Sequence, residues 1–279
     1  MLEHRAYSDV SFAAADSFWN VHAFDEVDST NTRIKEAIAQ GEPEGTCFVA
    51  RRQSAAYGRQ GRTWSSPEGG LYFSFILDPL GAHELAEKTL AHLPALSLLL
   101  SLAVQSALER FTQSEAIKIK WPNDILVVEE GQAAKLCGIS LEVVGGKLCC
   151  GIGINVARPE TASVGEPEAG NVPAYLSDLL PASSTLKRYE ETLQTLLPEV
   201  LNMIVALYRI WLRTGISFFI PKYDAHLYNI GQHVTLDSLT GKELYTGTVR
   251  GVSPSGELIL QASDGTQITA NSGEVHTRH

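Results

Sequence analysis

A glycine- and arginine-containing segment that leads directly into an apolar strand constrains this chain more than any other feature. Residues 53–77 read QSAAYGRQGRTWSSPEGGLYFSFIL, in which glycines space Arg59 and Arg62 and residues 71–77 favour β-structure. Glycine opens backbone conformations that expose N–H groups to an anion, and arginine adds a permanent charge whose fork fits carboxylate or phosphate. The segment predicts an anion-binding loop; a solvated surface loop is the alternative, because no P-loop or dinucleotide-fold spacing is present.

Length, charge and cysteine content narrow the class of protein. The chain has 279 residues, 44% apolar residues and a formal net charge of −10, with a pI near 5.3. These values fit one large and one small globular domain and argue against a broad nucleic-acid surface. The four cysteines show no CxxC or metal-ligand spacing, and residues 1–19 lack the pattern of a signal peptide. Residues 93–108 are too short and too interrupted for a membrane span, so we expect a cytoplasmic protein without membrane or nucleic-acid partners.

Hydrophobic periodicity predicts two regions with different strand spacing. The first has expected strands at 21–27, 46–52, 71–77, 117–120, 125–129, 135–144 and 147–156, and helices at 30–40, 84–111, 186–213 and 217–227. The helix at 84–111 is expected to break or start near Pro94, and Gly145-Gly146 is expected to form a hairpin turn. From Gly231 short strands at 233–237, 244–252, 257–261 and 267–270 alternate with turns, which is typical of a small barrel. We therefore predict a domain over residues 1–228, with 1–20 as an N-terminal extension, and a barrel over 229–279.

Five motifs follow one another along the chain: Asp28-Ser29-Thr30-Asn31, the loop from Gln53 to Leu71, Lys120-Trp121-Pro122-Asn123-Asp124, Lys135-Leu136-Cys137-Gly138-Ile139 and Gly151-Ile152-Gly153-Ile154-Asn155. They resemble, in this order, the motifs of the biotin protein ligase family, and the resemblance extends from about residue 24 to the C-terminus. The loop pattern from Gln53 through Leu71 is the longest and most specific match. The resemblance implies an α+β fold, with a mixed, mostly antiparallel sheet and helices of the class II aminoacyl-tRNA synthetase/biotin ligase type, followed by an SH3-like barrel.

The resemblance also implies a function and a set of site residues. It implies an ATP-dependent ligase that makes biotinyl-5'-adenylate and transfers biotin to a lysine of a biotin carboxyl carrier domain, with Mg²⁺ bound to the substrate. A homodimer is compatible with it, and the metal ligands stay unassigned. The implied catalytic residues are Arg59, Lys120 and Lys135. The implied biotin contacts are Ser29, Thr30, Asn31, Gln53, Tyr57, Gly58, Arg59 and Lys135. The implied ATP contacts are Arg59, Arg62, Trp64, Asn123, Asp124, Lys135 and Asn155.

The residue types agree with that chemistry. Adenylation passes through a crowded anionic phosphorus centre, which needs fixed positive charge and N–H groups more than an acid or base. Without the family pattern, the sequence favours neither of two interpretations of Lys120 and Lys135: contact with an anionic ligand, or exposed strand lysines whose stems cover apolar surface. Gly58 and Gly61 make the loop around Arg59 a natural lid over the adenylate. The commonest family loop reads Gly-Arg-Gly-Arg-Arg-Gly-Arg where residues 56–62 read AYGRQGR, so Ala56 and Gln60 depart from it.

Three alternatives have distinct signatures. About twenty residues precede the first expected strand, too few for the winged-helix DNA-binding domain of bifunctional family members, so we expect the monofunctional type rather than a repressor. A lipoate ligase on the same catalytic fold would carry a differently patterned loop and would not need the Lys-Trp-Pro-Asn-Asp turn. A non-catalytic small-molecule-binding protein is disfavoured by the intact basic residues.

Overall fold

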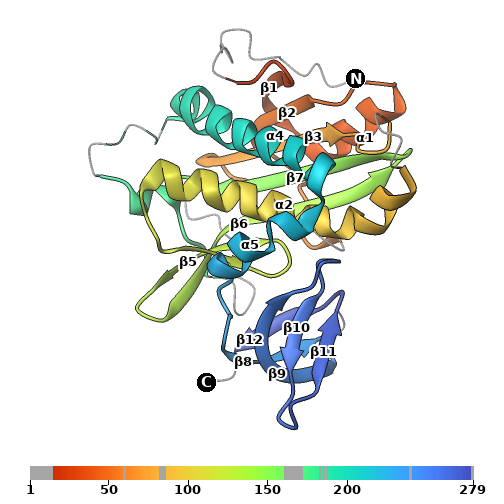
Figure 1. Ribbon diagram of the computed structural model, residues 1–279. Coiled ribbons are helices and arrows are strands. Elements are labelled where there is room, and N and C mark those ends of the chain that lie inside the picture. Colours follow the sequence, from red (N-terminus) through yellow and green to blue (C-terminus); the bar gives the residue numbers. More distant parts are fainter. Residues whose placement is uncertain are drawn as a thin grey trace.

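The computed structural model describes residues 15–58, 61–81, 86–159, 172–181, 184, 186, 188–238 and 241–277, with the backbone alone for 86–94. Two sheets organise this part of the chain, as Figure 1 shows. The first has seven strands in the order β1-β2-β3-β7-β6-β5-β4. Its strands are β1 (Asn20–Val27), β2 (Thr46–Gln53), β3 (Gly70–Leu77), β4 (Ile117–Lys120), β5 (Asp124–Glu129), β6 (Gln132–Val144) and β7 (Lys147–Asn155).

The seven-stranded sheet is mixed, as predicted. β1 pairs with β2 in parallel, and every other neighbouring pair is antiparallel. The hairpin between β6 and β7 turns at Gly145 and Gly146, whose φ angles of +57° and +83° favour glycine. This turn sets the register in which Gly138 of β6 lies opposite Gly153 of β7. The α+β fold expected from the sequence is confirmed.

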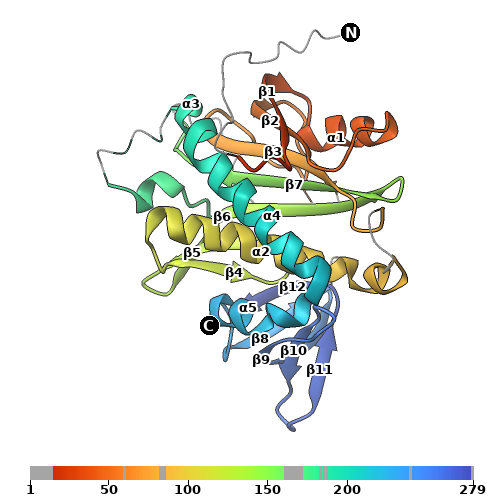
Figure 2. The same cartoon turned by 45° about the horizontal axis from the view of Figure 1, so that its top comes forward.

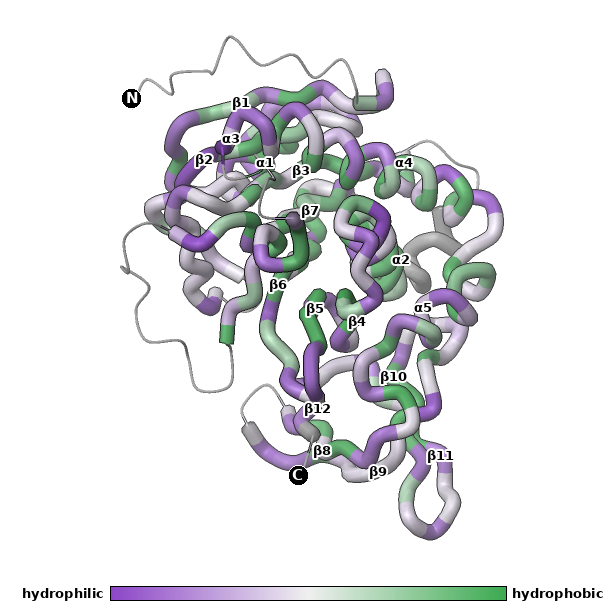
Figure 3. Tube along the Cα trace, turned by 90° about the vertical axis from the view of Figure 1, so that its left-hand side faces the viewer, coloured by the Kyte–Doolittle hydropathy of each residue, from purple (hydrophilic) through white to green (hydrophobic). Residues whose placement is uncertain are grey.

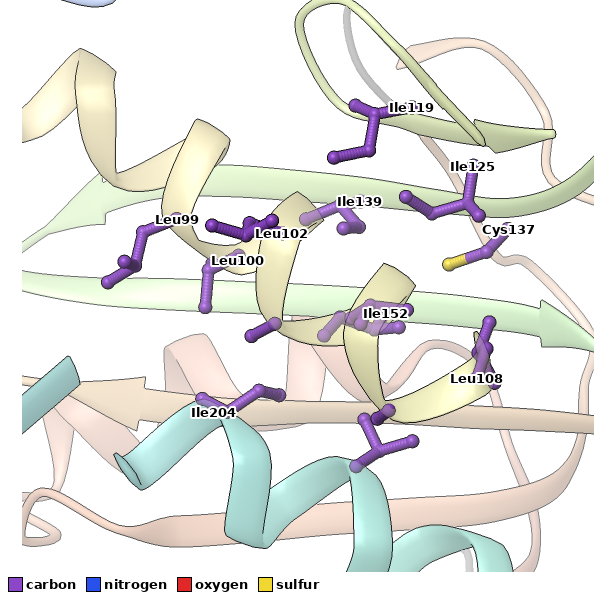
Figure 4. Close-up of a cluster of buried hydrophobic side chains, with 14 of the residues drawn as sticks. Leu99, Leu100, Leu102, Leu108, Ile119, Ile125, Cys137, Ile139, Ile152 and Ile204 are labelled. Atoms are coloured by element: carbon purple, nitrogen blue, oxygen red, sulfur yellow. The ribbon is translucent and has the colours of Figure 1, made fainter. Parts of the chain in front are cut away.

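One face of the sheet carries the main hydrophobic core. Alternate residues of β3, β6 and β7, such as Phe73, Ile139 and Ile152, point to this face. The helices α2 (Ala86–Thr112) and α4 (Leu197–Thr214) pack on it and against each other, and Figure 4 shows their leucines and isoleucines against the strands. In Figure 3 the hydrophobic segments of α2, β5 and β7 gather toward the middle of the molecule. Because the intervening strand residues point the other way, the opposite face is free to build a site.

The opposite face is only partly covered. Helix α1 (Thr30–Ala39) packs against β2, β3 and β7 through a small apolar cluster that includes Ile34, Ile38 and Ile76. Ser29 caps this helix, since its side chain accepts a hydrogen bond from the Thr32 N–H. The rest of this face lies open beside the N-terminal end of α1.

The helices differ from the sequence-based expectation in two places. Helix α2 runs continuously through Pro94, so the expected break or start there is wrong; burial of residues 95–108 outweighs the local cost of the proline. The expected helix at 186–213 is α3 (Tyr189–Glu191), a π-turn segment Thr192–Leu196 and α4. The segment Tyr189–Thr214 is long and apolar enough to cross a membrane by length and composition alone, but half of its most apolar 18-residue window is buried, and α4 packs on α2 as a core helix does.

The second sheet has five strands in the order β11-β10-β9-β8-β12, and the views in Figures 1 and 2 place it beyond the β4 edge of the first sheet. Helix α5 (Ile220–His226) leads into it, and the indole N–H of Trp121 donates to the Gly256 carbonyl at 3.1 Å. Its last strand, β12, was not predicted, because a segment of four mostly polar residues has no clear apolar alternation. The strands are β8 (His233–Asp237), β9 (Glu243–Val252), β10 (Leu258–Gln261), β11 (Gln267–Ala270) and β12 (Glu274–Thr277).

Candidate active site

A cavity of about 940 Å³ opens on the face of the seven-stranded sheet beside α1. Its wall comes from α1, the loop between β2 and β3, the turn between β4 and β5, strands β6 and β7, and strand β12 of the second sheet. Segments far apart in the sequence therefore meet around one space, as the strand order requires. A volume of this size fits a ligand as large as a drug molecule or a nucleotide.

Small side chains make the floor of the cavity. On β3, β7 and β6, Ser74, Gly151 and Ser140 lie side by side in the register. Asn31 lies over Gly151, because a Cβ atom added to that glycine would be 2.1 Å from the Asn31 Oδ1. The Ser74 hydroxyl donates to Asn31 Oδ1 at 2.7 Å, and Asn31 Nδ2 donates to the Ser140 hydroxyl oxygen at 3.0 Å. This buried network presents amide and hydroxyl groups to an uncharged polar ligand.

A second network connects the start of α1 to the loop. The backbone N–H of Thr30 donates to Gln53 Oε1 at 2.7 Å, and Gln53 Nε2 donates to the Ser66 hydroxyl oxygen at 2.9 Å. Ser29 and Thr30 are nearly buried, at 2% and 4% exposure. The N-terminal turn of α1 is thereby fixed at the edge of the cavity, and the N–H groups of Ser29, Thr30 and Thr32 are already bonded within the protein.

The loop between β2 and β3 folds back on itself as a narrow hairpin. Tyr57 bridges Thr63, the Gly58 N–H donates to the Arg62 carbonyl at 2.7 Å, and the Trp64 N–H donates to the Ala56 carbonyl at 3.0 Å. Its tip, residues 59 and 60, lies outside the described residues, so the predicted roles of Arg59 stay predictions. The flanks of the loop are thus held in place without a ligand.

The first flank of the loop is anchored through Tyr57. Its hydroxyl donates to Glu142 Oε1 on β6 at 3.1 Å, and the ammonium of Lys35 lies 4.9 Å from the centre of its ring. Lys35 also pairs with Glu142 at 3.1 Å. The hydrogen bond with Tyr57, together with the Glu142 carboxylate, raises the pKa of Lys35 to about 12. This cluster gives Tyr57 a fixed position.

Trp64 lies flat on the glycines of β6 and β7. A Cβ atom added to Gly153 would lie 2.6 Å from the Trp64 Nε1, and one added to Gly138 would lie 2.9 Å from its Cζ3. The Lys135 ammonium lies 5.4 Å from the indole ring centre. Among the described residues, the buried Trp64 Nε1–H finds no acceptor, so a bound ligand can provide one.

Cationic side chains line one wall of the cavity. Lys135 Nζ pairs with Asp124 Oδ2 at 2.9 Å, and its backbone carbonyl accepts a hydrogen bond from Asn155 Nδ2 at 3.1 Å. Burial lowers the pKa of Lys120 from its ordinary value; the Asp124 and Glu274 carboxylates oppose that shift, and Lys135 adds to it. Burial makes the unpaired charge of Lys120 unfavourable, so pairing with an anionic ligand stabilises this lysine more than it would stabilise an exposed one.

Within the described part of the chain, every predicted site residue borders this one cavity. The polar side chains are differently engaged: Asn123 Nδ2 donates to the Ile139 carbonyl, and Asn155 contacts the Lys135 backbone. Asp124 pairs with Lys135 of β6. Four further residues at the cavity were not predicted. Ser74 and Ser140 lie on predicted strands, where alternation points to them, whereas the sequence holds no signal for Glu274 and His276. The predicted site residues that border the cavity are Ser29, Thr30, Asn31, Gln53, Tyr57, Gly58, Arg62, Trp64, Lys120, Asn123, Asp124, Lys135 and Asn155.

Comparisons with known proteins agree with this architecture. The profile of the Biotin/lipoate A/B protein ligase family matches residues 23–157, and that of the Biotin protein ligase C terminal domain matches residues 230–277. The biotin protein ligase from Aquifex aeolicus in complex with biotin and ATP superposes with a TM-score of 0.74 at 32% identity, covering 93% of this chain and 98% of that chain. The biotin--[acetyl-CoA-carboxylase] ligase of Paracoccus denitrificans is 29% identical over 86% of this chain and 94% of its own length. The Bifunctional ligase/repressor BirA of Bacillus subtilis is 27% identical over 92% of this chain and 75% of its own length.

Proposed function

Because this chain belongs to the biotin protein ligase family, we propose that it is an ATP-dependent ligase that activates biotin as biotinyl-5'-adenylate and transfers it to a lysine of a biotin carboxyl carrier domain. The single observation that carries this proposal is the division of the cavity into two kinds of wall. The floor around Asn31 offers neutral hydrogen-bonding groups, and the wall around Lys120, Lys135 and Arg62 offers positive charge. An uncharged ring with a carboxylate tail and a nucleotide phosphate need this combination.

In the first step a biotin carboxylate oxygen attacks the α-phosphorus of ATP, the bond from that phosphorus to the bridging oxygen breaks, and pyrophosphate leaves. We assign the buried network of Ser74, Asn31 and Ser140 to the biotin ring end. Lys135 lies near Trp64 and is already oriented by Asp124, so it is suited to bring the carboxylate and α-phosphate together. Lys120 and Arg62 provide further charge for the anionic transition state, which is the largest contribution a protein makes to such a reaction.

In the second step the amine of the acceptor lysine attacks the carbonyl carbon of the mixed anhydride, and AMP leaves with the bridging oxygen. The anhydride is also open to water, so the site must stay closed between the steps. Tyr57 and Trp64 fix the flanks of the loop beside the cavity. From the glycines around Arg59 in the sequence, we propose that this residue helps to close the site over the adenylate. The acceptor is proposed from the family relationship alone.

Mg²⁺ is proposed as part of the nucleotide substrate rather than as a resident ion. Among the described residues, no group of three or more His, Cys, Asp or Glu side chains is arranged to hold a metal. The two carboxylates at the cationic wall, Asp124 and Glu274, are each paired with a basic side chain. Mg²⁺ commonly relies on substrate phosphates and water, which this site accommodates.

The deciding experiment is incubation of the protein with ATP and Mg²⁺ plus either biotin or lipoate, followed by mass spectrometry of the small-molecule products. We expect biotinyl-adenylate, and biotin on a lysine once a carrier domain is added. Lipoyl-adenylate without biotinyl-adenylate would favour the lipoate ligase alternative, which the Biotin/lipoate A/B family profile also includes. Absence of both adenylates would favour a non-catalytic binding protein.

We also propose that residues 1–228 and 229–279 form a catalytic and a barrel domain. The two sheets and the two family profiles support this division. The barrel nevertheless borders the cavity through β12, so removing it is expected to alter the site.

A further inference from the structure

Strand β12 brings the barrel to the wall of the cavity. Val275 packs in the hydrophobic core and is 3% exposed, so the side chains of the neighbouring Glu274 and His276 leave the strand on its other face, and residues 273–276 all border the cavity. Gly273 fixes this approach, since its φ is +139° and an added Cβ atom would lie 2.8 Å from the Asp237 carbonyl oxygen on β8. The backbone position of Glu274 is therefore set by close packing within the barrel.

The carboxylate of Glu274 forms an ion pair with the guanidinium of Arg62, on the second flank of the loop. The side chains are 34% and 46% exposed, so the pair is only partly shielded from water. The Arg62 backbone is held by the hydrogen bond from the Gly58 N–H. Among the described residues, this ion pair is a direct polar link from the barrel to the loop.

The ion pair between Arg62 and Glu274 opposes the binding of an anionic ligand. Arg62, Lys120 and Lys135 form the cationic wall, and Glu274 and Asp124 are the carboxylates set among them. A phosphate that takes Arg62 leaves Glu274 without its partner and brings two negative charges close together. Pairing of Arg62 with Glu274 and pairing of Arg62 with phosphate therefore compete.

We propose that Glu274 is a positioning residue that holds Arg62 at the wall before nucleotide binds and gives it up to the nucleotide phosphates. Its charge weakens nucleotide binding by the free enzyme, and nucleotide binding in turn releases the barrel from the loop. This inference rests on the proposed function, because it takes ATP as the ligand.

The test is the dissociation constant of a non-hydrolysable ATP analogue, measured by calorimetry for the wild type and Glu274→Gln at low and high salt. Glutamine keeps the shape and hydrogen-bonding ability of the side chain and removes the charge. A partly exposed ion pair is weak, so we expect binding of the analogue to tighten by only about two- to fivefold in Glu274→Gln. This difference should shrink as salt rises.

The matched control is Glu199→Gln. Glu199 pairs with Arg110 at 3.2 Å, is 31% exposed and lies on α4, away from the residues that line the cavity. We expect its affinity for the analogue to equal that of the wild type. A purely structural role for Glu274 would not produce tighter binding.

Equal or weaker binding by Glu274→Gln would overturn the inference, and weaker binding would assign Glu274 to the nucleotide or its metal. Biotinyl-adenylate formation by the same wild-type preparation tests the proposed function separately. Adenylate formation together with an unchanged dissociation constant rejects the role of Glu274 alone. A wild type that binds no analogue yet forms adenylate rejects the role of Glu274 alone, and one that neither binds the analogue nor forms adenylate rejects both proposals.

Discussion

Gly151 on the floor of the cavity gives the sharpest test of how the site is built. A methyl group at this position would lie 2.1 Å from the Asn31 Oδ1 and 2.6 Å from the Ser140 hydroxyl oxygen. Asn31 is short and 5% exposed, so it cannot move aside without breaking its hydrogen bonds to Ser74 and Ser140. We therefore expect Gly151→Ala to disrupt the floor rather than merely fill space.

The magnitude of the effect is set by the two hydrogen bonds of Asn31 that the methyl group would break. Each of these bonds contributes about 1 kcal/mol, and a buried polar group left without a partner costs about 1–3 kcal/mol. We expect Gly151→Ala to lower the free energy of unfolding by about 2–4 kcal/mol, which for a chain of this size lowers Tm by on the order of 10 °C. Biotin affinity should fall by at least about tenfold, since the same network forms the proposed biotin contact.

A double-mutant cycle with Asn31→Ala checks the cause. Asn31→Ala removes the same two hydrogen bonds but also vacates the space that the methyl group needs, and the Ser140 hydroxyl is then free to rotate. The double variant should be little less stable than Asn31→Ala alone, with a coupling of about 1–3 kcal/mol in urea denaturation. Additive losses would refute the reasoning, because they would mean that the methyl group and Asn31 do not meet.

Three further predictions concern the charged residues. Lys135→Ala should slow adenylate formation by roughly 10²–10³-fold with a small change in Tm, because its partner Asp124 stays partly hydrated; a collapse of stability with normal activity per folded molecule would make Lys135 structural. Lys120→Met should raise the Tm of the ligand-free protein near neutral pH, where the wild-type lysine bears its buried charge, and this gain should shrink as pH rises through the lowered pKa of Lys120 towards its ordinary value; an unchanged Tm across that range would contradict the burial argument. Arg59→Gly should leave adenylate formation measurable but release biotinyl-adenylate faster and label a bystander protein such as albumin, because a charge-assisted contact of about 1.5–3 kcal/mol offsets only part of the cost of ordering the loop; an unchanged off-rate without bystander labelling would restore the surface-loop interpretation.

Local sequence signals were sufficient for most strands and for the motifs that meet in the cavity. The hairpin at Gly145-Gly146 was predictable because two adjacent glycines between alternating runs favour one turn type. That hairpin fixes the register of β6 against β7, and the register places Gly138 beside Gly153 under Trp64. Much of the floor thus follows from one turn and the twofold period of strands.

What the sequence did not reveal depends on contacts between distant segments. The pairing of Lys135 with Asp124 needs β5 and β6 in their bulged register, which no property of either residue specifies. Helix α2 continues through Pro94 because burial of the residues that follow outweighs a local preference.

The barrel strand β12 illustrates the same limit at the site itself. Its burial pattern depends on pairing with β8, so Glu274 on its own resembles an ordinary surface carboxylate. Once paired, the strand presents that carboxylate to Arg62, more than two hundred residues earlier in the chain. Both sheets contribute to this wall of the cavity. Because Arg62 can pair strongly with either Glu274 or a nucleotide phosphate, nucleotide binding beside the first sheet changes the contact with the second. The proposed coupling between barrel and loop therefore depends on Glu274, a residue that its local sequence does not distinguish.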